Sequence, residues 1–268
     1  MKKVGLLAGN GNLPILFTQA ARSMGMEVIV ISLVADAQVA ILKQVANKVH
    51  EISVGQLDAI IRTLKEEGVT EVTMLGKVTK EHLFSGTVPD MRMQKLLFSL
   101  PDKKDDTMML ALVKELAGEG IMVFDQTLLI KQLMPPVGVL TKRQPTEAEL
   151  ADMEFGLAAA REIGRMDIGQ TVVVKNRALM AVEAIEGTDA CIKRGGLLGR
   201  GGVVVAKTAK PQQDLRFDVP AIGVKTLESM IEAKASALVI EAGKTLVVDQ
   251  ARVVQMADEA GIAIAVME

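Results

Sequence analysis

Short apolar runs alternate with helical patterns along the first half of the chain. Residues 4–8 and 27–34 are predicted to be buried strands, and residues 15–24 between them carry the 3.6-residue period of a helix. Two strands joined through a helix are parallel, with a right-handed crossover. The same patterns predict further strands at 50–54, 72–75 and 121–124, and helices at 56–67, 91–100 and 107–116. The first half is therefore predicted to be a Rossmann-like domain with a parallel sheet.

Hairpin signals distinguish the second half. Asn176-Arg177 separates two apolar runs and predicts a hairpin of 171–175 with 178–184, and Ala242-Gly243-Lys244 predicts another of 237–241 with 245–248. Further strands are expected at 203–206 and 262–266, and helices at 147–163, 190–198, 224–233 and 250–259. Hairpins combined with strand–helix alternation predict an α/β domain with a mixed sheet.

Two helix starts in the second half carry capping signals. Thr146 and Glu149 match the capping box of the first helix, and Thr188 or Asp189 is expected to cap the second. The best linker candidate is Met134-Pro135-Pro136-Val137, because consecutive prolines cannot continue a helix and form a stiff joint. We therefore predict an N-terminal Rossmann-like domain at 1–134, a C-terminal catalytic α/β domain at 137–268 and a linker around 134–137.

Composition narrows the possible functions. A formal net charge of -2, with no Trp and no Tyr, argues against a nucleic-acid surface. One Cys excludes an internal disulfide framework, and two His leave too few ligands for a zinc site. Any bound metal would then be held by oxygen, which favours Mg²⁺ or Mn²⁺. The first apolar run is too short for a signal peptide and no run is long enough for a membrane span, so we expect a cytoplasmic protein.

A glycine-rich loop joins the first predicted strand to the first predicted helix. Its sequence is Gly9-Asn10-Gly11-Asn12-Leu13-Pro14. Backbone amides and the helix dipole favour an anion at such a point, although a turn that needs glycine dihedrals is an equal explanation. Pro14 stands where the dinucleotide fingerprint has its third glycine, which disfavours a nicotinamide cofactor with Asp36 as the ribose-binding acid. Lys77 follows the predicted fourth strand and is expected at the same sheet edge, unless it is only a solvated loop lysine.

The segment Asp214-Leu215-Arg216-Phe217-Asp218 is the strongest candidate for chemistry. In an extended strand, Asp214, Arg216 and Asp218 share one face. Three charges on one face are costly to dehydrate unless they meet a counter-charge, a metal or an anionic ligand. The alternative is an edge strand whose charged face is only solvated.

Charged and polar residues also gather at element ends within the predicted second domain. They are Glu183, Thr188, Asp189, Arg194, Lys207 and Lys210. Carboxylates mixed with cations suit a phosphate ester bound together with a divalent metal. The G-x-S-x-G and G-x-x-x-x-G-K-[ST] patterns are absent, so hydrolysis by metal-activated water is the simplest mechanism that these residues support.

Motifs spread over almost the whole chain carry a family resemblance. They are GNGNLP at 9–14, GVLT at 138–141 with Pro145-Thr146, DIGQ at 167–170, AVEAIEGTD at 181–189, and KPQQDLRFDVP at 210–220 with Ile222-Gly223 and Thr226. With these motifs the chain resembles the UDP-2,3-diacylglucosamine pyrophosphatases of the LpxI type. The resemblance implies hydrolysis of UDP-2,3-diacylglucosamine to UMP and 2,3-diacylglucosamine 1-phosphate in lipid A biosynthesis. It also implies a divalent metal, a site between two domains and water attack on the phosphorus nearer the sugar.

The resemblance assigns roles to residues of this chain. It implies that Asp218 is essential, acting on metal or water, that Asp214 is a ligand or an orienting group, and that Arg216 contacts phosphate. The expected metal ligands are Asp218, Asp214, Asp189 and Glu183. The expected substrate-binding residues are Gly9, Asn10, Gly11, Asn12, Leu13, Lys77, Thr141, Gln170, Thr188, Arg194, Lys207, Lys210 and Gln213.

An acylated substrate would bring the protein transiently to the surface of the inner membrane, and the sixteen Met residues suit a flexible apolar ligand. Two alternatives stay open at this point. One is a non-catalytic protein that binds a nucleotide or a lipid precursor. The other is an NAD(P)-dependent oxidoreductase, which Pro14 disfavours.

Overall fold

The computed structural model describes residues 2–34, 38–78, 88–102, 105–125, 129–130, 133–211, 213–214, 216 and 219–268, with the backbone alone at 105–106. Packing divides the chain into two compact units. Unit 1 is Met1–Ile130 with Leu215–Phe217, and unit 2 is Lys131–Asp214 with Asp218–Glu268. Within the described residues, no helix combines the length and the apolar character needed to cross a bilayer.

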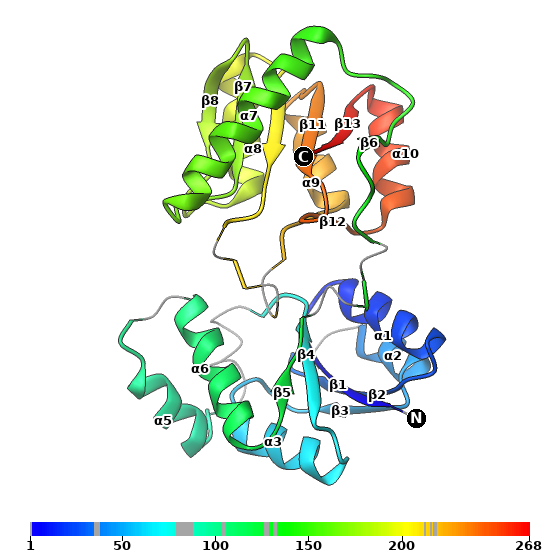
Figure 1. The fold of residues 1–268 in the computed structure, drawn as a ribbon, viewed down its shortest axis with the longest axis vertical. Coiled ribbons are helices and arrows are strands. Elements are labelled where there is room, and N and C mark those ends of the chain that lie inside the picture. The colour runs from blue at the N-terminus through cyan, green and yellow to red at the C-terminus, as the bar shows by residue number, and fades with distance from the viewer. Residues whose placement is uncertain are drawn as a thin grey trace. The chain divides into compact units, whose positions relative to one another are not determined.

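Unit 1 is built on a parallel five-stranded sheet (Figure 1). Its strand order is β3-β2-β1-β4-β5, with β1 Lys3–Ala8, β2 Glu27–Ser32, β3 Lys48–Glu51, β4 Glu71–Leu75 and β5 Met122–Val123. The two strands β1 and β2 are apolar at nearly every position, as strands covered on both faces must be. The prediction of a parallel Rossmann-like sheet is confirmed, although the third strand begins two residues earlier than expected.

Helices cover both faces of this sheet. They are α1 Leu13–Ser23, α2 Gln38–Val45, α3 Leu57–Glu66, α5 Met91–Ser99 and α6 Asp105–Gly118. Helices α3, α5 and α6 pack over Leu7, Ile29 and Ile31, and α1 and α2 lie on the other face (Figure 1). Because side chains alternate along a strand, Leu6 and Val30 point to that second face. The short helix α2 is the one described element of unit 1 that the sequence patterns did not predict.

Unit 2 contains a mixed six-stranded sheet of order β6-β13-β11-β9-β7-β8. Its strands are β6 Gly138–Val139, β7 Thr171–Lys175, β8 Ala178–Val182, β9 Val204–Lys207, β11 Ala237–Glu241 and β13 Ala263–Met267. The central strands β9, β11 and β13 are parallel, and β6, β7 and β8 are antiparallel to their neighbours. The mixed sheet and the hairpin over Asn176-Arg177 are therefore confirmed.

One long helix covers one face of this sheet, and three helices cover the other. The long helix is α7 Glu147–Arg165, and the opposite layer holds α8 Thr188–Gly199, α9 Val224–Glu232 and α10 Gln250–Ala260. Alanines such as Ala206 and Ala265 line the α7 face. A Cβ on Gly156 of α7 would lie 2.7 Å from the Cβ of Ala206, so only glycine allows this close approach. Small residues thus set the distance between α7 and the sheet.

The strand predicted at 245–248 is present, but its predicted hairpin pairing is wrong. The chain does not fold back into a hairpin after β11; instead β12 Leu246–Val247 pairs with β10 Ala221–Ile222 in a separate parallel ladder. Strand β11 is buried at every position, because it lies between two parallel neighbours. The extended segment expected at 214–218 lies mostly outside the described residues; of its members, Asp214 has no regular secondary structure and Arg216 lies in a turn.

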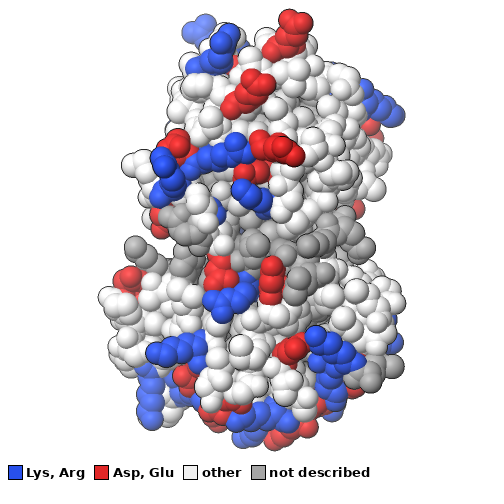
Figure 2. Space-filling view, in the orientation of Figure 1, with Lys and Arg blue, Asp and Glu red and all other residues white. Residues whose placement is uncertain are grey.

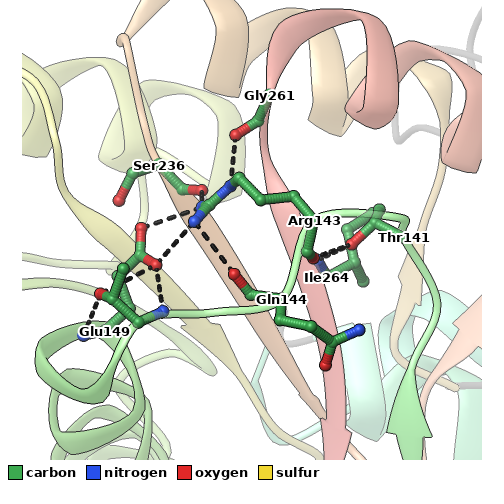
Figure 3. A network of polar contacts seen from close by, with 8 residues as sticks. Thr141, Arg143, Gln144, Glu149, Ser236, Gly261 and Ile264 are labelled. Carbon is green, nitrogen blue, oxygen red and sulfur yellow. Dashed lines mark hydrogen bonds and ion pairs between the residues drawn. The ribbon is translucent and has the colours of Figure 1, made fainter.

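The loop before α7 is fixed by Arg143 (Figure 3). Its guanidinium donates two hydrogen bonds of 2.9 Å to the Glu149 carboxylate and others to the carbonyls of Gly261, at 2.7 Å, and Ser236. Glu149 also closes the predicted capping box, with Thr146 as N-cap. The guanidinium therefore ties the start of α7 to the residues that precede β11 and β13.

The visible surface of each unit shows interspersed acidic and basic side chains (Figure 2).

Glu149→Gln is expected to destabilise the protein by on the order of 3 kcal/mol near neutral pH. Burial raises the pKa of Glu149, but hydrogen bonds from Arg143 and from the Thr146 amide outweigh it and lower the pKa from 4.5 to about 2. The contribution of the Glu149 carboxylate to the free energy of unfolding is therefore complete above pH 4.5 and is lost as pH falls toward 2. Denaturant unfolding of both proteins across this range should show the difference vanish at low pH. A difference that stays constant would contradict this electrostatic origin, and Glu147→Gln, an exposed acid in the same turn, is the matched control.

Candidate functional site

Polar side chains of unit 2 converge where three neighbouring strands reach one edge of the sheet. Thr171 begins β7 and pairs with Lys207 at the end of β9, and the Glu183 amide donates to the Thr171 carbonyl at 2.9 Å. Residues paired across a ladder point to the same face. Thr171, Glu183 and Lys207 therefore lie side by side, facing the layer that contains α8.

Thr188 joins these side chains through its hydroxyl. The hydroxyl donates to Glu183 Oε1 at 2.8 Å and accepts from Lys207 Nζ at 3.1 Å, and Thr171 Oγ1 lies 3.4 Å away. Lys207 and Glu183 are only 6% and 8% exposed. We call Thr171, Glu183, Thr188 and Lys207 the edge cluster. A buried cation and carboxylate bridged by a hydroxyl form a preorganised polar centre.

The N-terminus of α8 opens at the same cluster. Gly187, with φ 82°, is the N-cap, and no side chain caps the helix. The prediction that Thr188 or Asp189 caps α8 is therefore wrong: Thr188 is the first helical residue, and its hydroxyl is used in the edge cluster. In the described part of the chain, the amides of Thr188, Asp189 and Ala190 have no acceptor. Free amides, the helix dipole and a neighbouring lysine are the elements of a phosphate site.

Further buried polar atoms lie beside the edge cluster. Gln170 Oε1 and Thr208 Oγ1 are buried without a hydrogen-bond partner, and the Thr208 amide donates to the Gln170 carbonyl at 3.0 Å. Buried polar atoms are normally paired, so these can take hydrogen bonds from a ligand or from water. Gln213 has a similar unpaired Nε2, while its Oε1 accepts from the Lys210 amide at 3.0 Å.

Glu241 is a residue of this edge that the sequence prediction missed. It ends β11 and is 5% exposed, with ion pairs to Arg161 at 3.0 Å and Lys244 at 2.9 Å. Burial raises its pKa, but the hydrogen bond from Lys244, the Ala209 amide and the charge of Arg161 outweigh burial and lower the pKa overall. The signal that identified Lys207, a charge at the end of a buried strand, was also present at Glu241.

The structure gives several other predicted site residues structural partners. Arg194 binds the Val182 carbonyl at 2.9 Å and Glu186 at 2.5 Å, and Lys210 pairs with Asp167 at 2.7 Å. Asp189 lies 3.7 Å from Lys225. These three side chains are therefore held by neighbours of their own and do not join the edge cluster through any described contact.

Thr141 lies at the opposite edge of the sheet. Its hydroxyl accepts from the Ile264 amide at 3.0 Å and donates to the Arg143 carbonyl at 3.1 Å, beside the start of β13 (Figure 3). Lys207 lies at the far end of the parallel strands, on the order of 10 Å from Thr141 along the strand direction. The structure thus gives Thr141 a role in fixing the loop before α7 and does not bring it together with the edge cluster.

The glycine loop of unit 1 is held against Lys77. The Asn10 and Lys77 backbones exchange hydrogen bonds of 2.9 and 2.7 Å, and a Cβ on Gly9 would lie 2.8 Å from Gly76. The loop therefore needs glycine at this contact. The structure brings Lys77 and the loop to one edge of the parallel sheet, as their positions after β4 and β1 predict.

Fewer loop amides are available than the sequence suggested. Gly9 donates to the Leu75 carbonyl at 2.8 Å, Asn10 to the Lys77 carbonyl, and Gly11 to Gln38 Oε1 at 3.0 Å. The amides of Asn12 and Leu13, at the start of α1, have no acceptor among the described residues. Asn10 Oδ1 is buried and unpaired. This loop can therefore bind an anion at the start of α1, and Asn10 Oδ1 can accept a hydrogen bond from a ligand.

The predicted metal site lies only partly within the described residues. No three His, Cys, Asp or Glu side chains there come together as a metal site. Asp218 lies outside the described residues, as does Asp36, and Asp214 and Arg216 both have partners in the chain. Glu183 is bonded to Thr188. Cys191 is no nucleophile, because burial and then the charge of Glu183 raise its pKa to about 12.

Comparison with known proteins identifies relatives over the whole chain. The LpxI N-terminal domain model matches residues 3–133, and the LpxI C-terminal domain model matches residues 136–265. A protein of Caulobacter vibrioides, named UDP-2,3-diacylglucosamine pyrophosphatase LpxI, is 34% identical over 273 residues, which cover 98% of this chain and 96% of the relative.

Solved structures resemble the chain only distantly. The biotin carboxylase subunit of a pyruvate carboxylase aligns with a TM-score of 0.29 at 16% identity over 65% of this chain, and an N5-carboxyaminoimidazole ribonucleotide synthetase with ADP aligns with a TM-score of 0.29 at 17% identity over 72%. The matched regions span 35% and 44% of those two chains. The two family models and the Caulobacter relative are the informative matches, and they show that the chain belongs to the LpxI family.

Proposed function

We propose that this protein hydrolyses the pyrophosphate bond of UDP-2,3-diacylglucosamine, giving UMP and 2,3-diacylglucosamine 1-phosphate in lipid A biosynthesis. The observation that carries the proposal is the Caulobacter relative with this activity in its name, which matches 98% of the chain. The edge cluster and the α8 N-terminus support it, because together they offer amides and a buried lysine to a phosphate.

In the proposed reaction, a water oxygen attacks the phosphorus nearer the sugar. The bond from that phosphorus to the bridging oxygen breaks, and UMP leaves with the bridging oxygen. A carboxylate within reach of the water can orient it and accept its proton, which is the role proposed for Asp218 with help from Asp214. Negative charge builds on the phosphate oxygens during attack, and Arg216 and Lys207 are proposed to offset it.

The edge cluster explains how Lys207 would be held for this task. A buried lysine points in one direction only if its ammonium has fixed acceptors, and the Thr188 hydroxyl is such an acceptor at 3.1 Å. Glu183 fixes that hydroxyl in turn, and it offsets the lysine charge when no substrate is bound. Glu183 and Thr188 are therefore proposed as positioning residues for Lys207. Gln170, Gln213 and the glycine loop are proposed to bind the remaining polar groups of the substrate.

We also propose that the reaction requires Mg²⁺ or Mn²⁺. Oxygen donors of the Asp type suit these ions, and Mg²⁺ in phosphate sites is commonly held by one or two carboxylates together with substrate phosphates. Asp214 and Asp218 are proposed as those carboxylates, so three clustered acids are not required. When bound, the ion would offset phosphate charge and lower the pKa of a coordinated water.

The proposed substrate carries acyl chains, and we therefore propose that the protein works in the cytoplasm with transient contact to the surface of the inner membrane. The chemistry is tested by incubating the purified protein with UDP-2,3-diacylglucosamine and Mg²⁺, and again with EDTA. UMP release that stops with EDTA and returns with added Mg²⁺ is expected. No UMP at any metal concentration would reject the enzyme and favour a binding protein, and equal rates with EDTA would reject the metal.

A further inference from the structure

Helix α5 has two apolar faces, and only one of them is covered. Met93 and Leu96 are buried against α3 and α6 in the core of unit 1. On the other side, Met91 is 67% exposed and Phe98 is 87% exposed, and Val88, just before the helix, is 80% exposed. Large apolar side chains on a surface helix normally face the core. The second face of α5 therefore lacks a partner among the described residues.

This face is held firmly in place. Asp90 caps α5 by accepting from the Met93 amide at 2.8 Å, and its other oxygen accepts from the Asp58 amide at 2.7 Å. Arg92 binds Glu115 at 2.6 Å and also Glu119, so it ties α5 to the end of α6. The exposed side chains thus belong to a docked helix at the rim of unit 1 (Figure 1) and not to a frayed end.

The charged side chains of α5 itself are all basic. Lys95 is exposed and falls between Met91 and Phe98, four residues after the first and three before the second. No acidic residue occurs in α5, and Lys95 has no ion-pair partner among the described residues. Val88, Met91, Lys95 and Phe98, which we call the α5 stripe, combine large apolar groups with an exposed lysine. Helices that lie in the interface of a bilayer have this combination.

We propose that the α5 stripe is the surface through which this protein contacts an anionic lipid membrane. The proposal rests on the proposed function, in which substrate and product are both acylated. Phe98 and Met91 enter the boundary between headgroups and acyl chains, and the long Lys95 side chain reaches back to the anionic headgroups. Contact of this kind holds the chain where its substrate resides while α5 itself takes no part in the chemistry.

The absence of tryptophan from the sequence allows a direct test. Phe98→Trp introduces a single indole into the α5 stripe, and indole emission shifts to the blue when it leaves water for a lipid interface. We expect this shift on addition of phosphatidylglycerol vesicles and little with phosphatidylcholine vesicles. Met24→Trp is the matched control, since Met24 is 61% exposed at the end of α1 and lies outside the stripe; its emission should stay unchanged.

The electrostatic part of the proposal is tested in the same background. Lys95→Glu added to Phe98→Trp should weaken the apparent affinity for phosphatidylglycerol vesicles by at least about fivefold, because one basic residue contributes roughly 1 kcal/mol near an anionic surface. Raising the ionic strength should weaken it further. Affinity that does not respond to either change would overturn the anionic-lipid assignment.

Other outcomes also decide the matter. Equal shifts at Phe98→Trp and Met24→Trp, or none at Phe98→Trp, would overturn the proposal. A blue shift that grows with protein concentration without vesicles would do the same, since a second copy would then cover the stripe. Vesicle binding requires no turnover, so its loss is distinct from failure of the proposed activity. In support, Phe98→Ser should lose vesicle binding yet release UMP from a short-chain, water-soluble substrate at the normal rate.

Discussion

Asp218→Asn is expected to lower UMP release by about a thousandfold or more, within the range that general acid–base groups contribute. The change keeps the shape of the side chain but removes its charge, so the side chain can neither accept a proton from water nor hold a divalent ion as a carboxylate does. Substrate affinity should change little, because the phosphates and the sugar keep their other contacts. Single-turnover rates combined with equilibrium binding of the substrate measure the two effects separately.

A matched control for this variant is Asp258→Asn. Asp258 accepts from the Lys142 amide at 2.8 Å in unit 2, far along the chain from Asp218, and its carboxylate has no proposed part in the reaction. We expect near-normal turnover with some loss of stability. If Asp218→Asn kept more than about a tenth of the normal rate, the chemistry would have to move to another carboxylate of unit 2. Glu183 and Asp189 would then be the next candidates.

Lys207→Met is expected to lower kcat by about a hundredfold, which is a typical cost of removing one group that stabilises charge in the transition state. Methionine fills a similar volume but leaves the Thr188 hydroxyl without its cation, and a phosphate at the α8 N-terminus without a counter-charge. The effect should fall on kcat more than on KM if the lysine acts mainly as charge builds on the phosphate oxygens. Steady-state kinetics of UMP release separate these parameters.

Lys175→Met is the matched control at the other end of the same sheet. Lys175 ends β7, four residues after Thr171, and its ammonium binds the carbonyls of Gly199 and Gly201 at 2.8 and 2.7 Å. This variant should melt at a lower temperature and turn over at the normal rate. If both variants lose activity in proportion to their loss of stability, Lys207 is structural and the edge cluster is not the phosphate site.

Elements with strong periodicity were predictable from the sequence. The apolar runs of β1 and β2 with a helix between them fix a parallel pair, and the observed register pairs Lys3 with Glu27 and continues without a break. The Thr146–Glu149 capping box was equally clear, since its geometry depends on residues only three apart. Local patterns therefore identified local structure, and the β–α–β rule extended it to the sheet of unit 1.

Prediction failed where the partner of a strand lies far away in the sequence. Ala242-Gly243-Lys244 looks like a hairpin turn, but β11 is fully buried between β9 and β13 and leaves no edge for the residues that follow it. Its continuous apolar run, without alternation, was the sign of a central parallel strand. The alternating charges at 214–218 were a weaker signal, because an extended segment also needs a neighbouring strand to pair with, and Asp218 lies outside the described residues.

The sequence identified several residues of the candidate site, but it did not predict how their side chains contact one another. Lys207 and Glu183 were recognised as charges at strand ends, and the structure brings them together through Thr188. The bridging role of that hydroxyl could not be predicted, because Thr is a residue type that is favoured at N-caps. In the structure Gly187 is the N-cap, and Thr188 is the first residue of the helix. Glu241 was missed because the incorrect hairpin placed it at a turn.

Hydrolysis in water enriched in oxygen-18 tests the central claim most directly. If this chain is the proposed pyrophosphatase, mass spectrometry should find one heavy oxygen in 2,3-diacylglucosamine 1-phosphate and none in UMP, because water attacks the phosphorus nearer the sugar. A heavy oxygen in UMP would contradict the proposed direction of attack. Recovery of intact UDP-2,3-diacylglucosamine, with no UMP formed in the presence of Mg²⁺ or Mn²⁺, would contradict the proposed activity itself.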